Sequence, residues 1–426
     1  MMKNTIELAA GIVAMGMLTA VAGQMQCADY EAFVTAVESI PPVLKTTNLA
    51  SYSTNRLDFV LGNSIELTRG GRIWLNWISG EDGAGSFTVG CWSDDGGETW
   101  TDVNFVIDSH DGTVTDRTNI IGCYWSDPDG VLHYFTDQSL FHYDRRAGIW
   151  EMTCANPDAA TPVWSKWRRI GNGHLINKPI VLANGDWAFT GYLMDDGPYG
   201  RGAPEIAGKV RPFAALDGER GATCYISSDR GKTWEKRGTV TLPAGDWHES
   251  QLLERKDGTL VLFARVTDGG VGCMMASESQ DGGRTWTPSH RLTSMDNPNA
   301  RFQVMRLKSG RILFICHGHP EAGGKDKQGR TRMSAYLSDD ECKTWKGGLV
   351  LDEGCGSYPD AVQSSDGTIY VSHDHGRATD AEIWVHRFTE EDILAGKIVS
   401  PKGRLGTIAV RCMQSKFNRK RFGKAK

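Results

Sequence analysis

Four copies of one eight-residue motif, Ser-x-Asp-x-Gly-x-Thr-Trp, constrain the fold of this chain more than any other feature. The copies are Ser93–Trp100, Ser227–Trp234, Ser279–Trp286 and Ser338–Trp345, the last with Cys342 in place of the glycine. The motif is typical of a tight turn between two strands. Its Asp carboxylate caps the turn amides, its glycine adopts a positive φ, and its indole packs the turn onto neighbouring strands. A turn that recurs in this way predicts a repeat architecture built from strands.

A second pattern, strand, tight turn, strand, occurs six times. Its turn glycines are Gly71, Gly130, Gly185, Gly258, Gly310 and Gly367. Successive glycines lie 52 to 73 residues apart, which leaves room for four short strands in each unit. Six such units predict an all-β chain folded as a six-bladed β-propeller, with the Asp motifs on the outer hairpins of blades 1, 3, 4 and 5. The fifty glycines and fourteen tryptophans of the 426-residue chain agree with many turns and exclude a helical bundle or a coiled coil.

The ends of the chain lie outside these units. Lys3 precedes an apolar run that ends in the small residues of Ala20–Ala22, which is typical of a signal peptide and predicts a secreted or periplasmic protein. We expect no membrane insertion of the mature chain, because every other apolar run is too short. The predicted divisions are a signal peptide at 1–22, an N-terminal leader at 23–55, a propeller at 56–400 and a C-terminal extension with a basic tail at 401–426.

The last blade must be completed from one of the termini. We expect Glu382–Phe388 to be its third strand and Leu57–Leu61 to supply its outer strand. Thr389, followed by three acidic residues, is typical of a helix N-cap and predicts a short helix that ends near Gly396.

Charge and cysteine content exclude several classes of partner. The net charge is −5, so the chain lacks the basic field expected for binding nucleic acid, and we interpret the basic C-terminal residues as a solvated terminus. The ten cysteines form no Cys-x-x-Cys pair, so we predict no metal site and no cofactor. Several cysteines stand inside apolar strand-like runs, where buried free thiols are expected.

The motif and the six units together resemble the sialidase (neuraminidase) superfamily, and in particular the bacterial sialidase-like proteins with BNR repeats. The resemblance covers Ser64 to Lys397 and rests on these further segments: Asn177–Ile180, Glu249–Arg265, Asn297–Asn299, Ser357–Pro359 and Thr389–Asp392. It implies a six-bladed propeller and an exo-glycosidase that acts on glycans or oligosaccharides. The same fold also carries lyases and glycan-binding proteins, so the fold does not decide the activity.

Ligands of a propeller bind at the mouth of the central channel, near the start of each first strand and the end of each second strand. The polar residues at the first-strand starts are Asn177, Lys178, His248, Glu249, Arg301 and Tyr358. Those at the second-strand ends are Asp82, Arg265, His317, His319, Asp374, His375 and Arg377. We therefore predict a mouth that is dense in arginine, carboxylate and histidine.

The resemblance assigns roles to some of these residues. Trp247–Gln251, followed by Arg265, is similar to the family hairpin in which the Glu activates the tyrosine nucleophile and the Arg binds the substrate carboxylate. Gly356–Asp360 is similar to the strand of that nucleophile and assigns it to Tyr358. The acid/base Asp of the family lies in a loop that corresponds to Asp82 here, with Glu81 as the other choice.

One departure leaves the activity open. The family opens blade 1 with Arg-Ile-Pro, which supplies an arginine of the substrate clamp, whereas this chain reads Gly62-Asn63-Ser64-Ile65. Arg301 and Arg377 are candidates to complete a clamp with Arg265.

Three hypotheses follow. The first is a sialidase-like hydrolase of a terminal acidic sugar. The second, prompted by the histidines and the missing arginine, is a uronate-directed lyase or another exo-glycosidase, such as a rhamnosidase-like enzyme. The third is a glycan-binding propeller without catalysis. The sugar, the linkage and the oligomeric state are not determined by the sequence.

Overall fold

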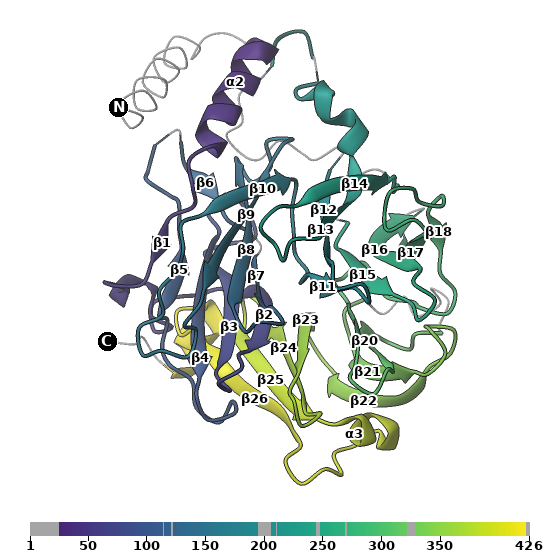
Figure 1. Ribbon diagram of the computed structural model, residues 1–426. Coiled ribbons are helices and arrows are strands. Elements are labelled where there is room, and N and C mark those ends of the chain that lie inside the picture. The colour runs from purple at the N-terminus through teal and green to yellow at the C-terminus, as the bar shows by residue number, and fades with distance from the viewer. Residues whose placement is uncertain are drawn as a thin grey trace.

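Six antiparallel sheets follow one another along the chain and surround a common centre (Figure 1). The computed structural model describes residues 25–113, 115–120, 122–194, 206–209, 211–243, 248–268, 271–321 and 329–422. The predicted all-β fold, a six-bladed β-propeller, is confirmed. The predicted signal peptide, residues 1–22, lies outside the described residues, so its cleavage and export stay predictions.

Blades 1 and 2 come from the first part of the chain. In blade 1 the order across the sheet is β1-β5-β4-β3-β2, and its strands are β1 (Leu44–Lys45), β2 (Leu61–Leu67), β3 (Ile73–Ser79), β4 (Phe87–Ser93) and β5 (Phe105–Ile107). In blade 2 both β6 and β7 pair with β8, and its strands are β6 (Arg117–Thr118), β7 (Gly122–Ser126), β8 (Leu132–Leu140), β9 (Gly148–Cys154) and β10 (Arg168–Asn172).

Blades 3 to 6 are four-stranded meanders in chain order. Blade 3 contains β11 (Ile180–Val181), β12 (Trp187–Leu193), β13 (Gly221–Ser227) and β14 (Glu235–Val240). Blade 4 contains β15 (Ser250–Glu254), β16 (Leu260–Asp268), β17 (Val271–Ser279) and β18 (His290–Arg291). Blade 5 contains β19 (Gln303–Arg306), β20 (Ile312–His317), β21 (Met333–Ser338) and β22 (Lys346–Asp352). Blade 6 contains β23 (Gly356–Gln363), β24 (Ile369–His375), β25 (Glu382–Phe388) and β26 (Arg404–Arg411).

The C-terminal segment completes blade 6. β26 pairs with β25 as the outer strand, so the prediction that Leu57–Leu61 supplies this strand is wrong. Leu61 instead begins β2, the first strand of blade 1. The propeller therefore extends past residue 400, into the segment predicted as a C-terminal extension. Apolar side chains of blades 1 and 6 share one core cluster, and Figure 1 shows the yellow β26 beside the purple strands.

The four Asp motifs lie where they were predicted, between the third and fourth strands of blades 1, 3, 4 and 5. In the second of these turns the carboxylate of Asp229 accepts hydrogen bonds from the backbone N–H and the hydroxyl of Thr233. Hydrogen bonds from the turn lower the pKa of Asp229 to about 2. The motif stabilises outer turns and takes no part in the channel.

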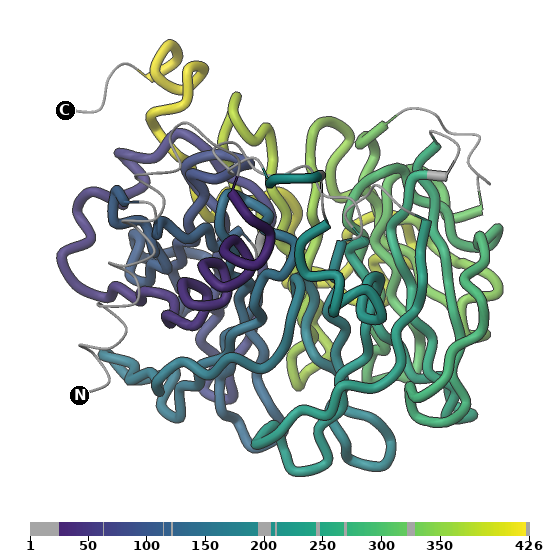
Figure 2. Tube along the Cα trace, turned by 90° about the horizontal axis from the view of Figure 1, so that it is seen from above, coloured from purple at the N-terminus to yellow at the C-terminus, as the bar shows by residue number. Residues whose placement is uncertain are grey.

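The described part of the chain contains three α-helices, α2, α3 and α4. α2 (Cys27–Glu38) lies outside the ring of sheets in Figure 1 and in front of the strands in Figure 2, and it packs its apolar residues against Leu140 and Phe213. α3 (Glu390–Ala395) begins after Thr389 and ends before Gly396, as predicted. α4 (Lys416–Phe422) closes the described chain. None of the helices in the described ranges is both long and apolar enough to cross a membrane.

The six first strands, β2, β7, β11, β15, β19 and β23, are the innermost of their blades. β2 contacts both β7 and β23, and β19 contacts both β15 and β23. Middle strands such as β3 and β8 are buried along their whole length, since each blade packs against a neighbour on both faces. Eight of the ten cysteines are buried free thiols, while Cys27 is half-buried and Cys355 exposed.

Candidate active site

Tyr358, Glu249 and Arg265 meet at one end of the central channel. Tyr358 is the third residue of β23, Glu249 directly precedes β15, and Arg265 lies near the end of β16. The phenol of Tyr358 donates a hydrogen bond to Oε1 of Glu249. Arg265 Nη1 lies 2.7 Å from the same Oε1 and 3.1 Å from the phenol oxygen. One carboxylate oxygen therefore contacts both a phenol and a guanidinium group.

Glu249 and Arg265 are buried and Tyr358 is half-buried, which strengthens the electrostatic interactions among the three side chains. Glu249 is 1% exposed, and its second oxygen, Oε2, has no hydrogen-bond partner among the described residues. A buried carboxylate oxygen without a partner is rare and is typical of a functional site. Burial and the charge of Glu249 raise the pKa of Tyr358, while the neighbouring guanidinium groups act in the opposite direction. The phenol is thus held protonated beside a carboxylate that is placed to receive its proton.

Two more arginines face the ring of Tyr358. The guanidinium carbon of Arg377 lies 4.6 Å from the ring centroid, and that of Arg330 lies 5.6 Å from it. Arg377 follows β24, and two hydrogen bonds fix its guanidinium group. Its Nε donates to Asp374 (3.2 Å) and its Nη2 donates to Ser357 (2.8 Å). Asp374 is fully buried, so it orients Arg377 and has no surface to offer a ligand.

Of these cations, Arg330 has the least negative charge beside it. Its Nε and Nη2 donate to the backbone carbonyl of Asn299, at 3.3 and 3.0 Å. No carboxylate in the described part of the chain lies within 4 Å of it. Burial lowers the pKa of Arg330, and the charges of Arg377 and Arg265 add to that effect. An anionic ligand would therefore bind favourably here, because its charge would reduce the repulsion among the three guanidinium groups.

Gly62 begins the segment of blade 1 in which the resemblance led us to look for an arginine. Its backbone has φ +50°, and a Cβ built there would meet the ring of Tyr358 at 3.3 Å. Its N–H donates to Asp374 at 3.0 Å, the same carboxylate that orients Arg377. The glycine thus allows close approach of β2 to the tyrosine.

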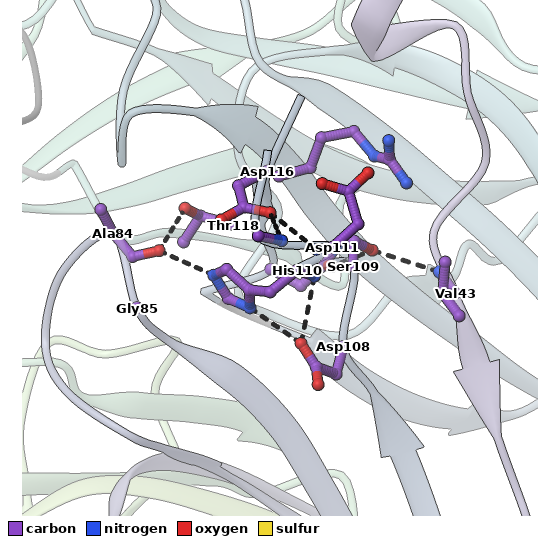
Figure 3. Close-up of polar contacts among 12 residues, drawn as sticks. Val43, Ala84, Gly85, Asp108, Ser109, His110, Asp111, Asp116 and Thr118 are labelled. Carbon is purple, nitrogen blue, oxygen red and sulfur yellow. Dashed lines mark hydrogen bonds and ion pairs between the residues drawn. The ribbon is translucent and has the colours of Figure 1, made fainter. Parts of the chain in front are cut away.

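Asp82 lies on an exposed loop after β3, with 60% of its side chain accessible and Oδ2 3.8 Å from Nη1 of Arg377. The same loop is anchored at Ala84. The carbonyl of Ala84 accepts hydrogen bonds from His110 Nε2 and Thr118 Oγ1, both 2.9 Å (Figure 3). His110 Nδ1 contacts Asp108 at 2.8 Å, and Figure 3 shows the imidazole bridging the two segments. The hydrogen bond to Asp108 raises the pKa of His110.

These side chains line one pocket of about 680 Å³, counted to its open mouth. Its polar lining comprises Asn76, Asp82, Glu249, Arg265, Arg301, Arg330, Tyr358 and Arg377. Its apolar wall comprises Leu61, Ile78, Ile120 and Ile176. No histidine of the described residues lines it.

Three other predicted binding residues belong to a network deeper in the channel. Arg301 lines the pocket but is 1% exposed, and its Nη2 contacts Asn177 Oδ1 at 2.8 Å and Asp360 Oδ1 at 3.6 Å. Lys178 contacts Glu66 at 3.0 Å and Asp360 at 3.1 Å. Asn177 and Lys178 line a second cavity, not this pocket. Lys178 joins blade 3 to blades 1 and 6 across the channel, whereas Asn177 contacts Ser250 of blade 4 and Arg301.

The predicted histidines are also turned away from the pocket. His248 contacts the carbonyl of Pro243 at 2.8 Å, and His317 contacts the carbonyl of Gly356 at 3.0 Å. Burial lowers the pKa of His317 to about 4, so this imidazole is neutral. His319 is exposed and packs on Tyr336. His375 contacts Asp352 at 2.5 Å, outside the pocket.

Arg330 is the site residue that the sequence reasoning missed. That reasoning considered only first-strand starts and second-strand ends. In an antiparallel blade the third strand begins at the edge where the second ends. Arg330 stands just before β21, the third strand of blade 5, and therefore reaches the same mouth. Polar residues before third strands are the signal that would have found it.

Comparisons with known proteins assign the chain to a family and match its fold. Residues 71–371 match the family model of the BNR repeat-like domain. The chain belongs to this family. A 174-residue stretch is 25% identical to a sialidase of Vibrio cholerae serotype O1 and covers 35% of this chain. That stretch spans 22% of the Vibrio protein, so the chain matches about a fifth of this relative's length.

Solved structures share the fold of this BNR repeat-like protein. The Hadza microbial sialidase Hz136 is 18% identical with a TM-score of 0.55, over 74% of this chain and 63% of that one. The intramolecular trans-sialidase of Ruminococcus gnavus, solved with oseltamivir carboxylate, is 12% identical with a TM-score of 0.57, over 82% and 98%. The leech intramolecular trans-sialidase is 12% identical with a TM-score of 0.58, over 81% and 70%. At these identities the likeness shows the fold alone.

Proposed function

We propose that this protein is an exported, sialidase-type exo-glycoside hydrolase that removes a terminal acidic sugar from glycans. The observation that carries the proposal is the contact of Tyr358 with Glu249 beneath three guanidinium groups. A phenol needs a base to act as a nucleophile near neutral pH, and Glu249 is placed to be that base. The arginines suit a carboxylate on the sugar, since guanidinium groups bind carboxylates through paired hydrogen bonds.

In the first step the phenol oxygen of Tyr358 bonds to the anomeric carbon while its proton passes to Glu249. The glycosidic bond breaks, and the leaving oxygen takes a proton from Asp82. In the second step water attacks the anomeric carbon and gives its proton to Asp82. The bond to Tyr358 breaks, and the phenolate recovers its proton from Glu249. Sialidases are an exception among glycosidases because their nucleophile is a tyrosine. The two displacement steps together retain the anomeric configuration.

The clamp in this proposal differs from the one expected from the sequence. Arg265, Arg330 and Arg377 supply the three guanidinium groups, and Arg377 on blade 6 replaces the missing arginine of blade 1. Arg301 is engaged with Asn177 and Asp360 and supports the floor of the pocket. The histidines that helped to prompt the lyase hypothesis lie outside the pocket, which removes one of the two observations behind that alternative and leaves the missing arginine of blade 1.

The test is release of a fluorophore from an aryl α-sialoside by the purified protein and by Tyr358→Phe. Turnover by the wild type that is lost in the variant supports the proposal. Binding of the free acidic sugar without turnover, across sialosides and uronic acid glycosides, would favour the glycan-binding hypothesis and overturn this one.

Two solved neighbours are intramolecular trans-sialidases, so the product must also be identified. Mass spectrometry of the released sugar separates the outcomes. Hydrolysis gives the free sugar, whereas intramolecular transfer gives an anhydro sugar that is smaller by one water.

A further inference from the structure

Three side chains that commonly bind metals meet at the start of β23, outside the pocket. Cys355 directly precedes this strand, His375 ends β24, and Asp380 lies in the loop that leads to β25. Their ligand atoms lie within 4.8 Å of one another. The sequence predicted no metal site because no two cysteines have the spacing of a local motif. Here the three donors are brought together by pairing of β23 with β24, in which Gly356 is opposite His375.

The imidazole of His375 is held in the orientation that a metal ligand requires. Its Nδ1 contacts Oδ2 of Asp352 at 2.5 Å, and its ring stacks on Trp384 with centroids 4.0 Å apart. The carboxylate fixes the proton on Nδ1 and leaves the lone pair of Nε2 directed at Cys355 and Asp380. Metal-binding histidines almost always have such a carboxylate or carbonyl on the other nitrogen, which fixes the tautomer and raises ligand basicity.

The distance between the first two donors fits a tetrahedral ion. Cys355 Sγ and His375 Nε2 are 3.6 Å apart. A tetrahedral Zn²⁺ with Zn–S of about 2.3 Å and Zn–N of about 2.0–2.1 Å separates these atoms by about 3.5 Å. Asp380 is anchored through its backbone, because Asn418 of α4 donates to its carbonyl at 2.5 Å. The third donor is therefore presented from a restrained loop.

The charges around the thiol favour a cation over a reactive nucleophile. Cys355, His375 and Asp352 also have the order of a thiol–imidazole–carboxylate triad. A nucleophilic thiolate, however, is stabilised by cationic neighbours. Here Asp380 joins Asp352 beside the thiol, so a thiolate would be the third negative charge in the cluster. A divalent cation neutralises such a group, and thiolate together with imidazole is the donor set that Zn²⁺ prefers over Mg²⁺ or Ca²⁺.

We propose that Cys355, His375 and Asp380 bind one Zn²⁺ ion, with water at the fourth position. The ion would join the segment that precedes β23 to the loop after β24. Tyr358 lies three residues after Cys355, and Arg377 lies between His375 and Asp380. The metal would thus restrain both the tyrosine strand and the arginine loop of the candidate active site, while its binding does not depend on what that pocket cleaves.

The test uses the full-length mature protein without an affinity tag, titrated with Co²⁺ and with Zn²⁺. We expect one Co²⁺ per chain, with a thiolate-to-cobalt absorption band in the near ultraviolet and the visible bands of a tetrahedral ion, both displaced by Zn²⁺. Cys355→Ser and His375→Gln should abolish these bands. Asp352→Asn keeps all three donors and should weaken binding by about 10–100-fold.

Cys27→Ser is the matched control, because Cys27 is also an accessible thiol but lies on α2. It should leave the cobalt spectrum and the affinity unchanged. Absence of a tetrahedral cobalt spectrum in the wild type, or its persistence in Cys355→Ser, would overturn the proposal. So would rapid alkylation of Cys355 by iodoacetamide that saturating Zn²⁺ does not slow, since that result indicates a free nucleophile. Melting curves of each variant establish that the loss is not caused by unfolding.

Discussion

The phenol of Tyr358 donates its hydrogen bond to Glu249, a residue 109 positions away in the chain and two blades away in the propeller. The pair forms because β15 and β23 both begin at the same end of the channel. Tyr358 has φ +58°, a conformation that is unusual for a large side chain. Strain of this kind persists where the surrounding structure holds it, and it is common at functional sites.

Replacing Tyr358 with phenylalanine should abolish catalysis and leave the fold intact. Tyr358→Phe removes one oxygen and keeps the ring that Arg330 and Arg377 contact. We expect kcat on an aryl sialoside to fall by ~10³-fold or more, with little change in KM, because the oxygen reacts and adds little to ground-state binding. Steady-state kinetics measure both constants. An unchanged kcat would assign the nucleophile to another group.

Substitution of Arg330 should act on recognition of the sugar acid. Arg330→Met is expected to lower kcat/KM by ~10–100-fold for an acidic sugar, since hydrogen bonds to charged groups contribute about 1.5–3 kcal/mol each. Arg291→Met, on exposed β18, removes the same charge at a distance and should have no effect. Inhibition by a free acidic sugar and by its methyl ester provides the measurement. Equal loss of affinity for both compounds would contradict a carboxylate clamp.

The roles of Asp82 and Glu81 can be separated by the leaving group. Asp82→Asn should slow cleavage of a natural glycan linkage by ~10²–10⁴-fold, whereas an aryl sialoside with an acidic phenol, which leaves without protonation, should be affected far less. Glu81 accepts a hydrogen bond from the N–H of Gly85 at 2.8 Å, a contact that Glu81→Gln retains. That variant should therefore cleave both substrates normally. The opposite result would transfer the acid role to Glu81.

The anchor of the Asp82 loop should depend on pH through His110. Both imidazole nitrogens face acceptors, Asp108 and the carbonyl of Ala84, so only the imidazolium form donates to both. Since the folded pKa is raised, with Asp108 and Asp116 as the negative groups nearby, this stabilisation is present below the ordinary pKa and is lost as the pH rises through the raised value.

His110→Gln should therefore lower Tm more at about pH 5.5 than at about pH 8.5, on either side of the usual histidine pKa of about 6.5. Misplacement of Asp82 should also lower kcat/KM, by up to ~10²-fold. Thermal unfolding of both proteins across this pH range is the measurement. A difference in Tm that grows with pH would show that the neutral imidazole makes the contact.

The sequence predicted the fold well because turns are local. The Asp motif and the hairpin glycines each determine a turn through residues that are adjacent in the chain. Six blades could therefore be counted without any long-range information. The outer strand of blade 6 could not be predicted in the same way. Leu57–Leu61 and β26 both have strand-like sequences, and which of them pairs with β25 depends on contacts between the two ends of the chain.

The candidate site was only partly predictable for a related reason. Tyr358, Glu249 and Arg265 were found because each belongs to a segment that resembles a family motif. The position of His317 or His375 in a strand does not reveal which face its side chain occupies, since successive residues alternate and a twisted strand end can turn either way. Both histidines contact groups of blades 5 and 6 and not the pocket.

Lys178 was predicted to bind substrate, and its contacts predict a structural role instead. Its ammonium group lies between Glu66 and Asp360 and also donates to the carbonyl of Ala361 at 3.1 Å. Lys178→Met would leave the buried carboxylate of Glu66 without its ammonium partner and that of Asp360 with Arg301 alone. Breaking a buried ion pair costs about 3–5 kcal/mol. We expect a lower denaturation midpoint in urea by this mechanism, with no specific effect on KM.

The loss of stability should become smaller in acid. Burial raises the pKa of Glu66 even beside Lys178, and without the ammonium group this carboxyl would be protonated at a still higher pH. Protonation removes the unpaired charge, so the difference in stability between wild type and Lys178→Met should be largest near neutral pH and should shrink as the pH falls. Lys232→Met, at an exposed turn, is the matched control and should change stability by less than about 0.5 kcal/mol. Normal stability of Lys178→Met, combined with weaker binding of an acidic sugar, would return Lys178 to the substrate site.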